Sequence, residues 1–160
     1  MFTKMKKAEM RSRANEVIDR VNLENANHKL PSEISGGMQK RVAIARAIVN
    51  NPKYLFCDEP NSGLDPKTAI VIDELIKDIT YENNITTIIN THDMNSVMEI
   101  GDKICLLNQG KLAWEGNKLD VLESDNEFLQ DFIFASPFLQ RLRDAALSHK
   151  VFNSENLTQE

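Results

Sequence analysis

The chain has 160 residues, of which 41% are hydrophobic and 27% are charged, and its formal net charge is −5. A chain of this length and composition can bury the core of one globular domain and is not expected to be disordered. Its acidic balance disfavours nucleic acid as a partner, and the lack of a long apolar stretch excludes a membrane-spanning helix and predicts a cytoplasmic protein.

The first half of the chain predicts two helices around a polar loop, then a strand and a third helix. Apolar residues at helical spacing predict a helix over residues 4–22, and a second helix is expected over 35–50, where Pro52 ends it. The apolar run over 54–57 is typical of a parallel strand that is covered on both faces. An Asp-Pro pair at 65–66 predicts the start of the third helix, because Asp caps free amides and Pro has no amide to lose.

The second half predicts two more strands, a hairpin and a helical tail. The β-branched run over 85–89 is expected to form a strand, and a short helix follows to Ile100, where Gly101 stops it. Residues 103–107 and 111–114 flank a turn and predict a hairpin. The order strand, helix, strand, helix, strand predicts an α/β fold with a parallel sheet and right-handed crossovers.

The helical tail is unusually rich in large apolar side chains. They are Phe128, Phe132, Phe134, Phe138, Leu139 and Leu142. Because two short helices cannot bury so much apolar surface alone, we expect this tail to form a protein–protein surface. Cys57 and Cys105 lie in apolar strand-like runs and are interpreted as reduced core residues.

Two short motifs carry the chemistry. The first, Ser35-Gly36-Gly37, puts a hydroxyl and two unobstructed amides at a helix start, where the dipole also favours a phosphate oxygen. The second, Asp58-Glu59, puts two carboxylates at the end of a buried strand, a usual place for a magnesium ligand and for a base that aligns water. Together they predict nucleotide hydrolysis.

One expected motif is missing from the 160 residues. The loop Gly-x-x-x-x-Gly-Lys-Ser/Thr, which cradles the phosphates of a bound nucleotide, occurs nowhere in the sequence. The chain is therefore interpreted as half of an ATPase.

The ordered motifs resemble the ATP-binding cassette (ABC) family up to about Leu122. Ser35-Gly36-Gly37, with Ile34 before it, matches the signature motif, and the strand ending in Asp58 matches the Walker B strand. The turn over 62–65 matches the D-loop and His92 matches the switch histidine. The resemblance implies an incomplete P-loop NTPase (RecA-like) parallel sheet with part of the ABC helical subdomain and a helical C-terminal tail. It divides the chain into residues 1–50, 51–122 and 123–160.

The resemblance also implies a role for each motif residue. Asp58 would hold Mg²⁺, Glu59 would act as the general base, and His92 would reach the γ-phosphate of ATP. The remaining nucleotide-contacting positions would face the ATP held by a second, head-to-tail ATPase subunit. These positions are Ser35, Gly36, Gly37, Met38, Ser62 and Asp65.

The resemblance further implies a membrane permease as a partner, which would place the chain on the cytoplasmic face of the inner membrane. The Walker A loop, the glutamine loop and the adenine-stacking aromatic of full cassettes have no counterpart here. We expect a truncated gene product or a partial sequence, with a split cassette as the less favoured alternative. The isolated chain is expected to be inactive and poorly stable, because a missing strand would leave the edges at 85–89 and 103–107 unpaired.

Only a few residues in the sequence indicate which type of ABC protein this is. Met38 in place of the usual signature glutamine resembles the Mla-type cassettes of phospholipid transport. A solute-importer cassette remains the close alternative. A non-transport ABC ATPase and a non-hydrolysing regulatory module also stay open, and the sequence does not indicate what is transported.

Overall fold

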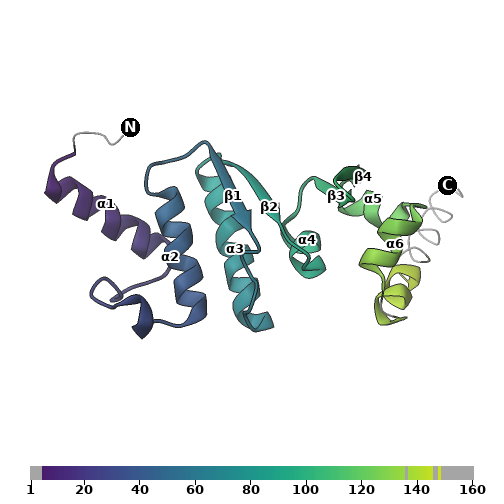
Figure 1. Cartoon of the computed structure of the whole chain (residues 1–160), viewed down its shortest axis with the longest axis horizontal. Helices are drawn as coiled ribbons and strands as arrows, with labels where there is room; N and C mark the ends of the chain where they lie inside the picture. The colour runs from purple at the N-terminus through teal and green to yellow at the C-terminus, as the bar shows by residue number, and fades with distance from the viewer. Residues whose placement is uncertain (1–4, 136, 146–147, 149–160) are drawn as a thin grey trace, which may run out of the picture. The chain divides into compact units, whose positions relative to one another are not determined.

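The computed structural model describes residues 5–135, 137–145 and 148, and it divides at Ile100 into two compact units (Figure 1). The first unit contains the helices α1 (Lys7–Arg20), α2 (Gly36–Ile48), α3 (Pro66–Glu82) and α4 (Met94–Ile100), a short 3₁₀ helix (Pro31–Glu33) and the strands β1 (Tyr54–Asp58) and β2 (Thr86–Asn90). The second unit contains β3 (Ile104–Asn108), β4 (Lys111–Gly116), α5 (Lys118–Glu123) and α6 (Glu127–Ile133). This boundary was not predicted, and the three-part division of the chain stays a prediction.

The first unit is a parallel strand pair with helices packed against one face. β1 and β2 pair in register from Tyr54 opposite Thr86 to Asp58 opposite Asn90, and α3 is the crossover between them (Figure 1). The core consists of aliphatic side chains: Val17, Val21, Leu23, Ile44, Ala45, Ile48, Leu55, Ile72, Leu75, Ile76, Ile79 and Ile85. The α/β fold with a parallel sheet is thereby confirmed.

The other face of this strand pair is open within the described residues. Tyr54, Phe56 and Ile88 are 62%, 70% and 53% exposed, although parallel strands usually have both faces covered. The prediction of a strand covered on both faces is therefore wrong for this part of the chain, because the helices pack only on the side of Leu55. The expected low stability of the isolated chain stays a prediction.

The second unit is a hairpin followed by short helices. β3 and β4 pair antiparallel, and the two residues that join them, Gln109 and Gly110, have φ of 48° and 74°. Two consecutive positive φ values are typical of the tight turns that join hairpin strands, so the predicted hairpin is confirmed. Within the second unit, β3 pairs with β4. The expected lack of a partner strand between residues 85–89 and 103–107 stays a prediction.

The apolar residues of the tail divide between core and surface. Leu129, Ile133 and Phe134 are buried, whereas Phe128 and Phe132 stack on each other with ring centroids 6.3 Å apart and remain partly exposed. Other apolar side chains of the tail are exposed as well: Phe138 and Leu142. Apolar surface of the tail therefore stays exposed among the described residues, and the protein–protein surface stays a prediction.

The two cysteines lie in different environments. Cys57 is half-buried, and burial raises the pKa of its thiol. Cys105 is exposed on the hairpin, so its prediction as a core residue is wrong, because none of the described segments covers that face of the hairpin. Both are free thiols. Among the described residues, none of the helices is long and apolar enough to span a membrane.

Candidate functional site

The carboxyl ends of β1 and β2 bring Asp58 next to Asn90. The two residues are paired in the strand register, and Asn90 Nδ2 donates a hydrogen bond of 2.7 Å to Asp58 Oδ1. The other carboxylate oxygen of Asp58 accepts no hydrogen bond from the described part of the chain, and the residue is exposed. Asp58 therefore presents a free oxygen at the sheet edge where α/β proteins bind their ligands.

The donor set fits magnesium only in combination with a phosphate ligand. Within the described residues, no group of three or more His, Cys, Asp or Glu side chains could hold a metal ion. Mg²⁺ in nucleotide sites commonly has one or two protein carboxylates and takes its remaining ligands from water and phosphate oxygens. One free oxygen on Asp58 satisfies this requirement.

Glu59 contacts His92 across the ends of the two strands. Glu59 Oε1 accepts a hydrogen bond from the His92 backbone N–H at 3.2 Å and lies 2.8 Å from His92 Nδ1. The backbone of Glu59 has φ of 47°, a left-handed conformation that is uncommon for a residue with a side chain. Its N–H donates to Asn90 O at 2.9 Å, and its carbonyl accepts from Lys40 Nζ at 3.0 Å, so both backbone groups are held.

The contact with Glu59 changes the protonation of His92. The hydrogen bond to the Glu59 carboxylate and its negative charge raise the pKa of His92 above the ordinary 6.5. Because the folded state binds this proton more tightly than the unfolded chain, the contact adds stability that is fully present below a pH of about 6.5. The added stability is lost as the pH rises through the elevated pKa.

We predict that Glu59→Gln lowers the pKa of His92 toward its ordinary value, because the amide keeps the shape of the side chain but loses the charge. The measurement is the pH titration of the His92 imidazole resonances by NMR, assigned with a His92→Gln variant. Glu115→Gln, which removes an exposed carboxylate that pairs with Lys103 at 3.2 Å, is the matched control. A His92 titration that does not respond to Glu59→Gln would contradict the contact.

The signature residues form the start of α2. Ser35 caps the helix, and its Oγ accepts the Met38 N–H at 3.3 Å. Ser35 and Gly36 are exposed, whereas Gly37 is buried against Thr68. The Met38 side chain packs against the core, so the described structure gives it a packing role. Its role in nucleotide binding, like that of Ser35, Gly36 and Gly37, stays a prediction.

The turn after β1 packs against this helix start. A Cβ on Gly37 would lie 2.7 Å from Thr68 Cγ2, and one on Gly36 would lie 3.7 Å from Leu64 Cδ2. Asp65 caps α3 by accepting the Thr68 N–H at 3.1 Å, which confirms the predicted helix start. Hydrogen bonds from the Thr68 side chain and backbone lower the pKa of Asp65.

The structure therefore groups the predicted site residues into two neighbouring clusters. Asp58, Glu59 and His92 form the first, at the strand ends. The second joins the start of α2 to the turn over 62–65, in which the exposed Ser62 donates its N–H to Glu59 O at 3.2 Å. Lys40 in α2 links the two clusters through its bond to the Glu59 carbonyl.

The sequence did not predict the contacts that two further residues make in this arrangement. The position of Asn90 next to Asp58 was predictable, because Asn90 is a polar residue at the end of a strand that runs parallel to the one ending in Asp58. Lys40 was not, because its contact with Glu59 joins residues 19 positions apart that no local pattern connects.

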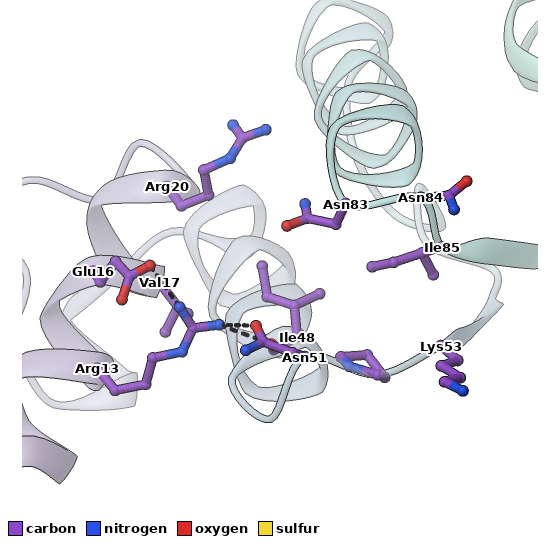
Figure 2. A pocket seen from close by; sticks show the side chains of 11 residues that line it. Arg13, Glu16, Val17, Arg20, Ile48, Asn51, Lys53, Asn83, Asn84 and Ile85 are labelled. Carbon is purple, nitrogen blue, oxygen red and sulfur yellow. Dashed lines mark hydrogen bonds and ion pairs between the residues drawn. The ribbon is translucent and has the colours of Figure 1, made fainter.

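A pocket of about 620 Å³ lies away from these clusters (Figure 2). Its lining includes Lys53, directly before β1, and Ile85, directly before β2, so it is at the amino ends of the strands. Arg13 crosses from α1 to the end of α2 here, donating to Val49 O at 2.9 Å and bonding to Asn51 and Glu16 (Figure 2). The pocket is thus distinct from the candidate site, and Arg13 satisfies groups at a helix C-terminus.

We predict that Arg13→Ala lowers the free energy of unfolding by about 1.5–3 kcal/mol, because it removes charge-assisted hydrogen bonds to the end of α2. The exposed Arg11 on the same helix is the control, and Arg11→Ala should change stability by less than about 0.5 kcal/mol. Urea unfolding followed by circular dichroism measures both. Equal destabilisation by the two substitutions would show that the Arg13 contacts contribute nothing specific.

Comparison with known proteins gives a consistent result. A family model described as ABC transporter matches residues 1–62. The methionine import ATP-binding protein MetN of Bacillus subtilis (strain 168) is 42% identical over 123 residues, which are 77% of this chain and 36% of that protein. Methionine import ATP-binding protein MetN 2 of Listeria innocua is 44% identical over 117 residues, which are 73% of this chain and 34% of that protein.

A solved structure agrees with these relatives. The ATP-binding cassette MJ0796, in a dimeric post-hydrolysis state bound to ADP and Pi, matches with a TM-score of 0.63 and 39% identity. The match covers 74% of this chain and 51% of that chain. The present chain thus spans about half of this cassette and little more than a third of the methionine import relatives.

These similarities correct one expectation and establish the family. The relatives are named for methionine import, so the resemblance to Mla-type phospholipid cassettes is not supported. It depended on Met38, on Pro31-Ser32-Glu33 before it and on the run over 35–48, and the partly buried Met38 side chain packs against the core. Sequence motifs, fold and relatives agree otherwise, and the chain belongs to the ABC transporter ATPase family.

Proposed function

We propose that this chain supplies the signature, Walker B and switch-histidine portion of an ABC ATPase that energises a solute importer. The observation that carries the proposal is the contact of Glu59 with His92 beside Asp58, at the carboxyl ends of two parallel strands. Import, and methionine or a similar small solute as its substrate, is proposed because the relatives are named for methionine import.

Each residue of the first cluster has a task that fits its surroundings. The bound Mg-ATP would supply the γ-phosphoryl group and the metal charge that neutralises it. Asp58 would hold the metal with its free oxygen. Glu59 has one carboxylate oxygen that accepts nothing within the described chain, and this oxygen would take a proton from water. His92 would orient Glu59 through Nδ1 and reach the phosphate with its other ring nitrogen.

The second cluster would act across a dimer. Ser35 and Gly36 are exposed at the start of a 13-residue helix, which suits a phosphate held by another subunit. We propose a head-to-tail pair of cassettes, in which Gly37, Met38, Ser62 and Asp65 complete the interface. The dimeric state of the MJ0796 cassette supports this arrangement. A membrane permease would be the further partner, placing the protein at the cytoplasmic face of the inner membrane.

The phosphate-binding loop would come from a segment outside these 160 residues, in the same polypeptide or another. The test is phosphate release from Mg-ATP by the purified 160-residue chain, and by a cassette in which the chain is joined to a half-cassette carrying that loop. We expect hydrolysis by the joined cassette and a background rate for the chain alone. Release by the chain alone that Glu59→Gln abolishes, or no turnover by a folded, nucleotide-bound joined cassette, would overturn the proposal.

A further inference from the structure

The most fully buried polar side chains of the first unit form a closed group of three. Asn61, Asp73 and Ser96 are only 7%, 5% and 2% exposed. Asn61 Nδ2 donates to Asp73 Oδ1 at 2.7 Å and to Ser96 Oγ at 2.9 Å, and Ser96 Oγ donates to Asp73 Oδ2 at 2.7 Å. Neither the sequence motifs nor the proposed chemistry assigns these residues a role.

The three residues come from three different segments. Asn61 lies in the turn after β1, two residues after Glu59. Asp73 lies in the middle of α3, and Ser96 lies in the first turn of α4, four residues after His92. The two segments that carry Glu59 and His92 are therefore tied to the same carboxylate in α3.

A purely structural explanation accounts poorly for this group. A buried polar cluster is costly unless its groups are paired, and replacing such a cluster by apolar residues is often neutral or stabilising. Desolvation raises the pKa of Asp73 in spite of its two hydrogen bonds, and Asn61 Oδ1 has no partner among the described residues. The cluster therefore contributes little net stability, whereas its directional bonds fix three segments in one geometry.

The backbone conformation of Glu59 requires neighbouring residues that are held in fixed positions. A residue with a side chain keeps a φ of 47° only where its neighbours hold it in this strained conformation. The following residues of the turn are held by Leu64 N–H donating to Asn61 O at 3.1 Å and by the buried Asn61 side chain. After the other strand, α4 begins two residues beyond His92, so fixing Ser96 fixes the start of α4.

We propose that Asn61, Asp73 and Ser96 form a buried brace that sets the position of Glu59 relative to His92. They are positioning residues, since none of them touches the reacting groups. Their importance for hydrolysis rests on the proposed function, in which Glu59 and His92 are the catalytic pair. Their effect on the contact between the Glu59 and His92 side chains does not depend on the proposed function, so it can be tested without nucleotide.

The test is the NMR titration of His92 in the 160-residue chain, carried out on Asn61→Ala and on the milder Ser96→Ala. Loss of the brace should loosen the Glu59–His92 contact, so the titration midpoint should move most of the way to that of Glu59→Gln. Ser96→Ala, like Asn61→Ala, removes two of the three hydrogen bonds, but it leaves Asn61, in the turn that carries Glu59, paired with Asp73, so a smaller movement in the same direction is expected.

Two further variants separate positioning from general loss of stability. Asn83→Ala removes an amide at the C-cap of α3 that donates to Ile79 O at 2.9 Å, so it should lower stability without moving the His92 titration. The exchange Asn61→Asp with Asp73→Asn places the carboxylate at position 61, where it can accept from the amide at 73 and from Ser96. The exchange therefore restores two of the three hydrogen bonds. The midpoint of the His92 titration should move most of the way back to that of the unsubstituted chain.

The proposal would be overturned by a wild-type His92 titration in folded Asn61→Ala or Ser96→Ala. It would also be overturned if Asn83→Ala moved the titration as far, or if the exchange variant folded without restoring it. If Asn61→Ala fails to fold, the His92 titrations of Ser96→Ala and of the exchange variant provide the test. If the His92 titrations show that the brace positions Glu59 and His92, but the joined cassette does not hydrolyse ATP, only the proposed function is refuted.

Discussion

Glu59→Gln should lower the turnover of a completed cassette by roughly 10²- to 10⁴-fold, the usual contribution of a positioned general base. The substitution keeps the size of the side chain and its hydrogen bond to the His92 N–H, but the amide cannot take a proton from the attacking water. Since Asp58 and the signature residues are unchanged, binding of Mg-ATP should be retained. The measurement is steady-state phosphate release together with equilibrium nucleotide binding on the same protein.

The control for this loss is Glu115→Gln in the hairpin of the second unit, an exposed carboxylate whose partner is Lys103. It removes the same charge outside the clusters and should leave turnover unchanged. If Glu59→Gln kept wild-type turnover while still binding nucleotide, the general base would have to be another residue.

Gly37→Ala should destabilise the chain by about 1–3 kcal/mol, because the added methyl group would lie 2.7 Å from Thr68 Cγ2. Thr68 cannot turn away freely, since its hydroxyl bonds to Asp65 at the start of α3. Gly36→Ala is the matched control on the neighbouring residue, where the new methyl group meets only Leu64 at 3.7 Å. Urea unfolding of both variants gives the comparison.

A second substitution tests the cause of this loss. Thr68→Ser removes Cγ2 and keeps the hydroxyl that bonds to Asp65, so Gly37→Ala combined with Thr68→Ser should recover most of the lost stability. The two single variants and the double variant form a cycle that isolates the coupling between these positions. Additive effects would show that Gly37 is needed for some other reason than the approach of Thr68.

Local signals in the sequence predicted elements of both units correctly. The start of α3 depends on Asp65 and the residues next to it, and the hairpin depends on two turn residues, so neither needs the rest of the fold. The sequence placed Glu59 and His92 at the ends of two strands, and the carboxyl ends of parallel strands meet at one edge of a sheet. The direct contact between the two side chains was not predicted and is a finding of the structure.

What the sequence did not predict depends on segments that only the fold brings together. The brace joins Asn61 to Asp73 and Ser96 over separations of 12 and 35 residues, and none of the three follows a recognisable motif. The open face with Phe56 was mispredicted for a different reason. An apolar strand pattern indicates that a face is suited to burial, but it does not indicate which segment covers that face.

The central feature of the proposed function is the cooperation of the signature residues with the acidic pair on one nucleotide. The direct measurement is phosphate release from Mg-ATP by the completed cassette with Ser35→Arg, compared with the unsubstituted cassette. We expect turnover to fall to the level of Glu59→Gln, because a bulky cation would displace the helix start that is proposed to face the nucleotide of a paired subunit. Undiminished turnover with Ser35→Arg would contradict the proposed role of this helix start.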